Sequence, residues 1–347
     1  MIKVSLIIPV YNVVKYIDRC LDSVMNQEYP DIECILVDDY TPDNSFEIIN
    51  KKLDAYSGRI DFKIVRHKEN RGLSAARNSG VKVATGDYIF FLDIMQLIFY
   101  PYVYLSIHYK LEGAIESFVD AIIEYGSVDF LIGDYQVIGN WYYRGIQSEK
   151  YLSSNVEIFS DYLSGKWYVM ACGKLINRSF FEKYNLWFVE GLLHEDELFS
   201  FRLAFFSNRM VYVNKNVYRY FIRNDSIMGH KRYKNYIDHL FVISENLKLS
   251  RSLKFGLSDS NIGCYFISVF YGIMFSVINN SSLNIVEKRE LIHQIQKNVK
   301  ELRRDIVIHT FKTHLEYHIL SSHYSVVNLV MKCYFYFCGI KYKRYEC

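Results

Sequence analysis

The chain has 347 residues, 50% of them hydrophobic and 23% charged, a composition typical of a globular protein with a large core and with two domains or one domain plus a substantial appendage. The net charge of +3, from 41 basic and 38 acidic side chains, is not the strong positive excess typical of nucleic-acid-binding proteins, so we expect no nucleic-acid partner. Seven cysteines without a CxxC pair favour reduced thiols in a cytosolic protein over a disulfide framework.

Strands alternate with helices in the amino-terminal part of the chain. The apolar stretch from Met1 to Asn12 predicts a first buried strand, because Pro9 interrupts it too early for a signal peptide or a spanning helix. Apolar spacing and turn residues then predict helices over residues 14–25, 45–56 and 74–84 and strands over residues 33–37, 61–67 and 88–92. This alternation indicates an α/β fold with a mostly parallel sheet. Neither GxGxxG nor GxxxxGKS/T occurs in it, which argues against a dinucleotide-binding fold and a P-loop NTPase.

The stretch from Cys34 to Ser45 places two carboxylates at the end of a buried strand. An apolar run leads to Asp38 and Asp39, and a cluster of Thr, Pro, Asp, Asn and Ser then precedes the next helix. Ligands of doubly wound sheets bind at the carboxyl ends of the strands, so these aspartates mark a candidate ligand site. Capping of the following helix by the same carboxylates is an equal alternative.

Six groups of residues, in order along the chain, carry a family resemblance. The first five are Ser5–Asn12, Leu21–Val24 with Asn26-Gln27, Val37-Asp38-Asp39 with Asp43-Asn44-Ser45, Glu69-Asn70 to Gly72–Asn78, and Gly86–Ile89 before Phe91-Leu92-Asp93. The sixth combines Gly173-Lys174-Leu175 with Phe188–Phe199. Together they resemble the family-2 glycosyltransferases with the GT-A fold, and the sixth is similar to the acceptor half of enzymes that build bacterial capsular and lipopolysaccharide chains.

The resemblance implies a division of the chain. A GT-A domain would occupy residues 1–225, with a nucleotide-sugar half at residues 1–95 and an acceptor half at residues 125–225. Residues 226–347 would form a helical carboxyl-terminal region.

Residues that hold the nucleotide follow from the same resemblance. In the family, the loop after the first strand and the carboxylate after the second strand clasp the base and ribose, which implies roles for Pro9, Tyr11 and Asp39, with Asp38 beside them. A fixed carboxylate would accept the imide N–H of a uracil-like base, so a UDP-linked sugar is the expected donor.

Arg77 and Asn78 are two further candidates for donor binding. They are predicted at the start of a helix beyond a Gly-containing turn, where backbone amides and a guanidinium could steady the donor. A structural arginine that bonds the carbonyl ends of the sheet, beside an asparagine on the helix face, fits the sequence equally well.

The family's Glu-Asp pair maps onto Glu195 and Asp196. Inverting transfer needs a carboxylate that takes the proton of the attacking hydroxyl, on the far side of the sugar from the leaving nucleotide. The resemblance assigns this role to Asp196, and like charges at residues 195–197 would raise at least one pKa of the cluster. Alternatively, these acidic residues form the first turn of a helix and only stabilise it by their interaction with the helix dipole.

At Asp93 the chain departs from the family pattern. The family carries Asp-Ser-Asp-Asp here and holds Mn²⁺ or Mg²⁺ with it, whereas this chain reads Asp93-Ile94-Met95-Gln96. Because these cations prefer hard oxygen ligands, Asp93 is the expected metal ligand that remains, and without a metal the leaving diphosphate would need cationic side chains. A metal-independent or weakened enzyme, an inactive paralogue and a reading-frame disturbance over residues 94–119 all fit this segment.

The carboxyl-terminal region is predicted to be helical. Cys264–Ile278 is apolar but short of the ~20 residues of a spanning helix, so a buried helix is expected, with an interfacial helix as the second choice. Charge alternates along residues 287–305, which predicts a helix with a charged, solvated face. The aromatic tail over residues 326–340 and the basic cluster after it fit either a helix on an anionic membrane surface or a last helix packed on the core.

The resemblance therefore implies inverting transfer of a sugar from a nucleotide-sugar donor to a surface-polysaccharide or lipid-linked glycan acceptor. The expected location is the cytoplasm or the inner face of the cell membrane, with peripheral membrane contact. The alternative is a catalytically impaired homologue that binds nucleotide-sugar or serves as an assembly subunit.

Overall fold

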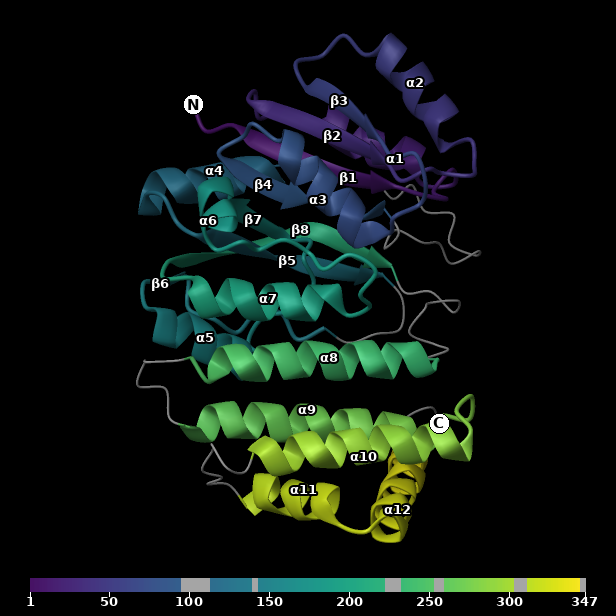
Figure 1. Ribbon diagram of the computed structural model, residues 1–347. Coiled ribbons are helices and arrows are strands. Elements are labelled where there is room, and N and C mark those ends of the chain that lie inside the picture. The colour runs from purple at the N-terminus through teal and green to yellow at the C-terminus, as the bar shows by residue number, and fades with distance from the viewer. Residues whose placement is uncertain (95–112, 139–142, 222–231, 253–258, 303–310, 344–347) are drawn as a thin grey trace. The chain divides into compact units, whose positions relative to one another are not determined.

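The computed structural model describes residues 1–94, 113–138, 143–221, 232–252, 259–302 and 311–343 (Figure 1). The chain divides into two compact units, Met1–Asp225 and Ser226–Cys347. The first is an α/β unit and the second is helical.

The first unit is built on an eight-stranded sheet with the order β3-β2-β1-β4-β7-β5-β8-β6 (Figure 1). Its strands are β1 (Val4–Val10), β2 (Ile32–Asp38), β3 (Asp61–Arg66), β4 (Tyr88–Phe91), β5 (Phe130–Ile138), β6 (Tyr151–Leu152), β7 (Lys174–Asn177) and β8 (Met210–Phe221). The β3-β2-β1-β4 half is parallel throughout, and β5 and β8 are also parallel to each other. β7 runs antiparallel between β4 and β5, and β6 is antiparallel to β8. The predicted α/β fold with a mostly parallel sheet is confirmed.

Helices cover this sheet. They are α1 (Ile17–Met25), α2 (Ser45–Ala55), α3 (Leu73–Val83), α4 (Ala114–Tyr125), α5 (Asn155–Leu163), α6 (Arg178–Lys183) and α7 (Glu195–Phe206). All side chains of β1 are buried, as expected for a strand with both faces covered. Leu6 and Ile8 join one core cluster with residues of α1 and α4. Ile7 points to the other face, where α3 lies.

Gly80 explains the close approach of α3 to the sheet. A Cβ atom at this position would lie 2.4 Å from Cγ2 of Ile7 in β1, well inside van der Waals contact. Because the helix carries no side chain here, its backbone can pack directly on the strand. This contact fixes the height of α3 above β1.

One edge of the sheet collects the residues predicted to bind ligands. β1, β2, β4 and β5 point the same way, so their carboxyl ends share this edge, and antiparallel β7 begins there. Tyr11 follows β1, Asp38 ends β2, Asp93 follows β4 and Lys174 starts β7. The topology therefore brings both predicted halves of the site to the same edge.

The structure describes part of the segment 94–119, for which a reading-frame disturbance was one of three alternatives. α4 starts at Ala114, and its residues Ile115 and Phe118 are fully buried in the core with β1 and β4. Ile94 is also fully buried. Residues 95–112, including Met95 and Gln96, lie outside the described residues.

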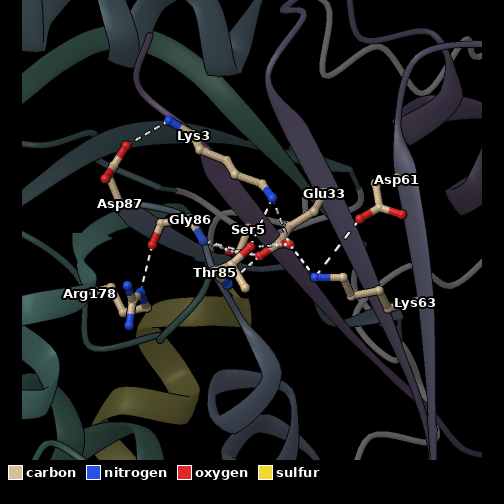
Figure 2. A network of polar contacts seen from close by, with 9 residues as sticks. All are labelled: Lys3, Ser5, Glu33, Asp61, Lys63, Thr85, Gly86, Asp87 and Arg178. Atoms are coloured by element: carbon tan, nitrogen blue, oxygen red, sulfur yellow. Dashed lines mark hydrogen bonds and ion pairs between the residues drawn. The ribbon is translucent and has the colours of Figure 1, made fainter.

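At the opposite edge of the sheet, the buried carboxylate of Glu33 in β2 fastens neighbouring segments (Figure 2). Its oxygens accept hydrogen bonds from Ser5 Oγ at 2.5 Å and Lys63 Nζ at 2.7 Å. They also accept from the backbone N–H of Thr85 at 2.5 Å and of Gly86 at 3.1 Å. The amino-terminal ends of β1, β2 and β3 and the turn before β4 are thus joined through one side chain.

Glu33→Gln should lower the free energy of unfolding at neutral pH by about 3 kcal/mol, because the groups that donate hydrogen bonds to this carboxylate lose a charged partner. Burial acts to raise the pKa of Glu33, but hydrogen bonds, led by that of Lys63, hold this pKa well below its usual value. Its stabilising effect should therefore be present above the pKa of an unfolded glutamate and be lost as the pH falls. The free energy of unfolding in urea, measured between pH 3 and pH 7, tests this. The control is Asp61→Asn, which removes an exposed carboxylate near the same lysine. Equal effects of the two substitutions would contradict it.

The second unit consists of α8 (Tyr233–Ser250), α9 (Asp259–Asn279), α10 (Ile285–Leu302), α11 (Phe311–Ser321) and α12 (Tyr324–Lys343). The predicted helical region is therefore observed. α10 buries an apolar face, which includes Leu291 and Ile295. Its charged residues Arg289, Glu290 and Lys297 are exposed, in agreement with the solvated face predicted from the charges.

α9 is longer than the apolar run predicted, because residues before Cys264 extend the helix to 21 residues. By length and composition alone its segment Asn261–Asn279 suffices to cross a membrane, which corrects the expectation that it is too short. Half of the apolar window is buried within the protein, as in a core helix. Phe266, Phe270 and Met274 are among its fully buried side chains.

Candidate active site

Arg77 in α3 joins carboxylates from two distant parts of the chain. Its Nε and Nη2 atoms donate to the two oxygens of Asp93, with 3.3 Å between Nε and Oδ1. Its Nη1 atom donates to Glu195 Oε1 at 3.1 Å and to Asp196 Oδ1 at 2.9 Å. The arginine side chain is 0% exposed. Its hydrogen bonds to the carboxylates are therefore shielded from water, and each is stronger than it would be at the surface.

Asn78 fastens the segment before α7 to α3. Its Nδ2 donates to the carbonyl oxygen of Phe188 at 2.9 Å, and its Oδ1 accepts from the N–H of Phe188 at 3.0 Å. The Phe188 ring lies against the Arg77 guanidinium, 4.8 Å from Cζ to the ring centroid. His194, at φ 64°, then turns the chain into α7. Asn78 and Phe188 together hold Glu195 within reach of Arg77.

The charges of this cluster are unbalanced, since three carboxylates face one guanidinium. Burial acts to lower the pKa of Arg77, but Asp196 and the other two carboxylates hold it well above its usual value. Burial and then Asp196 raise the pKa of Glu195 to about 7. The Glu195-Asp196 pair can therefore take up and release a proton near neutral pH, which suits general base chemistry.

Asp93 is poorly suited to bind a divalent cation in this arrangement. Both of its carboxylate oxygens accept bonds from Arg77, and the Tyr218 hydroxyl donates to its backbone carbonyl at 3.3 Å. Ile94 offers only carbon atoms and is buried. Among the residues that the structure describes in this motif, Asp93 is the single carboxylate and Arg77 already bonds both of its oxygens, so the ligand set for Mn²⁺ or Mg²⁺ is poor.

Asp39 is surrounded by donors from the loop after β3. Oδ1 lies 2.7 Å from His67 Nδ1 and accepts from the Arg71 N–H at 2.8 Å. Oδ2 accepts from Asn70 Nδ2 at 3.0 Å and from the Gly72 N–H at 2.8 Å. The carboxylate thus orders the loop that leads into α3, and a nucleobase N–H would have to replace one of these donors.

The two aspartates after β2 do not cap the next helix. Asp38 is half-buried and accepts from the Thr41 N–H at 2.9 Å, within its own turn. Asp43 instead accepts from the N–H and hydroxyl of Ser45 at the start of α2. Asp39 accepts from the N–H groups of Arg71 and Gly72, which precede α3. The alternative in which both aspartates cap α2 is therefore wrong.

Exposed aromatic rings flank the ends of β1 and β2. Tyr11 is 38% exposed and Tyr40 is 61% exposed, while Pro9 is buried within β1. Asn12 and Tyr40 adopt left-handed backbone conformations, at φ 53° and φ 58°, and the Asn12 N–H donates to Thr41 Oγ1 at 2.8 Å. Such costly conformations in non-glycine residues are often retained at functional sites.

Arg77 and Asn78 lie in the second turn of α3 rather than at its start, because the helix begins at Leu73. Their backbone amides donate within the helix and are not offered to a donor, which corrects the prediction. The alternative placed the arginine on carbonyl groups, but it bonds carboxylates. The sequence did not reveal these partners because they lie far from residue 77 along the chain.

Lys174 is a buried cation to which the sequence motif gave no role. Its Nζ atom donates to the carbonyl oxygens of Tyr168, at 3.1 Å, and Met170. The Tyr168 ring centroid lies 4.4 Å from the same atom. Burial lowers the pKa of Lys174 to about 7. Ser200 of α7 holds the carbonyl of Val169 in the same loop, so this loop is fixed one turn beyond Asp196.

The chain is similar to known glycosyltransferases in sequence and in fold. Residues 5–94 match the model of glycosyl transferase family 2. The glycosyltransferase GlyA of Streptococcus pneumoniae is 32% identical over 241 residues, which are 65% of this chain and 31% of GlyA. The poly(ribitol-phosphate) β-N-acetylglucosaminyltransferase TarP of Staphylococcus aureus is 30% identical over 223 residues, 63% of this chain and 62% of TarP.

The crystal structure of S. aureus TarS residues 1–349 in complex with UDP-GlcNAc has a similar fold. Its TM-score is 0.65 at 17% identity, and the match covers 92% of this chain and 90% of TarS residues 1–349. This chain spans about a third of the length of GlyA. Residues 5–94 therefore match glycosyl transferase family 2 in a unit with the GT-A fold, and the proteins similar to the chain include glycosyltransferases such as GlyA and TarP.

Loss of the Arg77 guanidinium should leave three carboxylates without their shared cation. We expect Arg77→Leu to lower the free energy of unfolding at pH 7 by about 3–5 kcal/mol. Part of the loss should be regained at pH 5, where Glu195, whose pKa is raised to about 7, is protonated. Urea unfolding of this variant is compared with that of Arg71→Leu, whose exposed ion pair should contribute at most about 1 kcal/mol. Similar losses in both variants would contradict the assigned role.

Proposed function

We propose that the protein transfers a sugar, with inversion, from a nucleotide-sugar donor to a surface-polysaccharide or lipid-linked acceptor. The observation that carries the proposal is the joining of Asp93, at the end of β4, to Glu195 and Asp196, at the start of α7, by one buried arginine. Acids that the resemblance assigns to the donor half and to the acceptor half therefore meet at one point.

The nucleoside is proposed to lie at the ends of β1 and β2, against Pro9, Tyr11, Asp38 and Asp39. Exposed Tyr11 can stack on a base, and half-buried Asp38 can accept a hydrogen bond from it. The similar TarS structure holds UDP-GlcNAc, so UDP is the first nucleotide to test.

Asp196 is proposed as the general base. It would take the proton of the acceptor hydroxyl while that oxygen bonds to the anomeric carbon and the bond from this carbon to the diphosphate breaks. Glu195 bonds the same Nη1 atom of Arg77 and lies beside Asp196, so its negative charge, when it is ionised, attracts the proton that is transferred. Arg77 keeps both side chains in place and is a positioning residue.

A catalytically impaired protein is the second candidate. It is favoured by the engagement of both Asp93 oxygens by Arg77, which leaves the usual Mn²⁺ or Mg²⁺ ligand occupied. In that case the protein would bind nucleotide-sugar, or a partner glycosyltransferase, without turnover. Turnover of a nucleotide-sugar, measured with added Mn²⁺ and with EDTA, separates the two candidates, because the impaired protein should give none under either condition.

Peripheral contact with the inner face of the cell membrane is proposed for the carboxyl-terminal helices. Val326 and Leu329 in α12 are 49% and 64% exposed, which leaves apolar side chains for a lipid surface. A lipid-linked acceptor would be presented at such a surface. The basic cluster after residue 340 lies beyond the side chains that the structure describes.

Asp196→Asn should lower the rate of sugar transfer by about 100- to 10,000-fold, because the amide cannot accept the proton. UDP release is measured with UDP-GlcNAc and UDP-glucose as donors and poly(ribitol phosphate) as the first acceptor. UDP affinity, measured by calorimetry, should change by less than about threefold, since the proposed base does not hold the nucleotide. Full activity of this variant would refute the assignment of Asp196.

The rate of transfer should rise with pH through about 7, because the raised pKa of Glu195 keeps that carboxyl protonated below this value. Its deprotonation adds a negative charge beside Asp196, where the proton of the acceptor hydroxyl would be taken up. Glu195→Gln should abolish this rise, whereas Glu197→Gln, on the same helical turn, should keep it. A wild-type profile that is flat between pH 5.5 and pH 8 would contradict this coupling.

A further inference from the structure

The proposed donor carries a diphosphate that needs a cation. Arg77 is fully buried and already bonded to three carboxylates, so it has no exposed face for phosphate oxygens. Asp93 is engaged by the same arginine and does not fit a bridging metal ion. The acids at this edge of the sheet would repel an anionic ligand unless another positive charge compensates them.

Arg71 is an exposed cation between the proposed nucleoside site and the segment that leads to Glu195 and Asp196. Its backbone N–H donates to Asp39 Oδ1 at 2.8 Å, which fixes the residue beside the proposed nucleoside site. Its Nη2 atom reaches both carboxylate oxygens of Glu190, at 2.8 Å and 3.1 Å. The two side chains are 40% and 41% exposed, so the pair is open to solvent.

Glu190 lies in the segment that leads to the catalytic acids. This segment is fastened two residues earlier, where Asn78 bonds both backbone groups of Phe188, and it enters α7 at Glu195. Arg71 therefore extends from the nucleoside side of the site to the side where the sugar would react. In a nucleotide-sugar the diphosphate occupies this interval, between the nucleoside and the anomeric carbon.

We propose that Arg71 binds the diphosphate of the donor, and that Glu190 holds the guanidinium until the donor arrives. This inference rests on the proposed function and adds a binding residue to it. The exchange is favourable because a solvent-exposed ion pair is weak, whereas a guanidinium matches two phosphate oxygens at once. When the bond to the sugar breaks, the same contact stabilises the charge that develops on the leaving diphosphate.

A purely structural role of the pair makes the opposite prediction for Glu190. If Arg71 and Glu190 only brace the two loops, removal of either charge should weaken nucleotide binding or leave it unchanged. If Glu190 competes with phosphate for Arg71, removal of its charge should tighten the binding of a diphosphate. Glu190→Gln keeps the shape of the side chain and so separates the two roles.

The test is calorimetric titration of the full chain with uridine and with UDP, in EDTA. Arg71→Ala should weaken UDP binding by about tenfold or more, the effect of losing a charged hydrogen-bond partner. Its affinity for uridine should stay within about twofold of wild type, which also controls for folding. Glu190→Gln should bind UDP about two- to fivefold more tightly than wild type, by release of an exposed ion pair. Arg59→Ala, at an exposed arginine before β3, should behave as wild type.

The outcomes separate this inference from the proposed function. Equal UDP affinity in wild type and Arg71→Ala, or weaker UDP binding in Glu190→Gln, would overturn the role of Arg71 and leave the nucleotide site standing. UDP binding that requires Mn²⁺ and ignores Arg71 would do the same. If the wild-type protein binds none of UDP, GDP, CDP and dTDP, the proposed function fails, and the inference fails with it.

Discussion

The candidate site depends on one buried guanidinium. Arg77 can be ionised without solvent only because carboxylates surround it, and those carboxylates can lie close together only because Arg77 lies between them. The interaction links α3 to the end of β4 and the start of α7. Gly80 sets the height of α3, and Asn78 holds the incoming segment of α7, so packing and hydrogen bonding place the charges before any ligand arrives. The cluster is preorganised in the sense that catalysis requires.

The same cluster changes how a donor would be held. In the family pattern, several carboxylates after the fourth strand of the nucleotide half bind a metal ion, which in turn binds the diphosphate. Here Ile94 is part of the core, and Asp93 is bonded to a protein cation. The charge of a diphosphate must then be met by side chains that remain exposed. Arg71 satisfies this condition because its partner, Glu190, is also exposed.

Much of the fold was predictable from the sequence, because β1, β2 and β4 are apolar runs that end at polar turns, and α1 to α3 have helical spacing. The order of the motifs also indicated the family. The contacts of the site were not predictable, since Arg77 meets Glu195 across 118 positions of chain and Asp39 meets Gly72 across 33. The sequence did not indicate that Lys174 is buried or that Tyr40 has a left-handed backbone conformation, because both properties depend on the folded structure. The length of α9 was underestimated because polar residues at its start do not interrupt the helix.

A crystal structure of the protein with UDP bound would show directly how the donor is held. We expect the uracil at the ends of β1 and β2, the diphosphate within hydrogen-bond distance of Arg71, and Arg77 still bonded to Asp93, Glu195 and Asp196. This binding mode would be contradicted if Asp93 left Arg77 to coordinate a metal ion that bridges the diphosphate. It would equally be contradicted if the nucleotide bound away from this edge of the sheet.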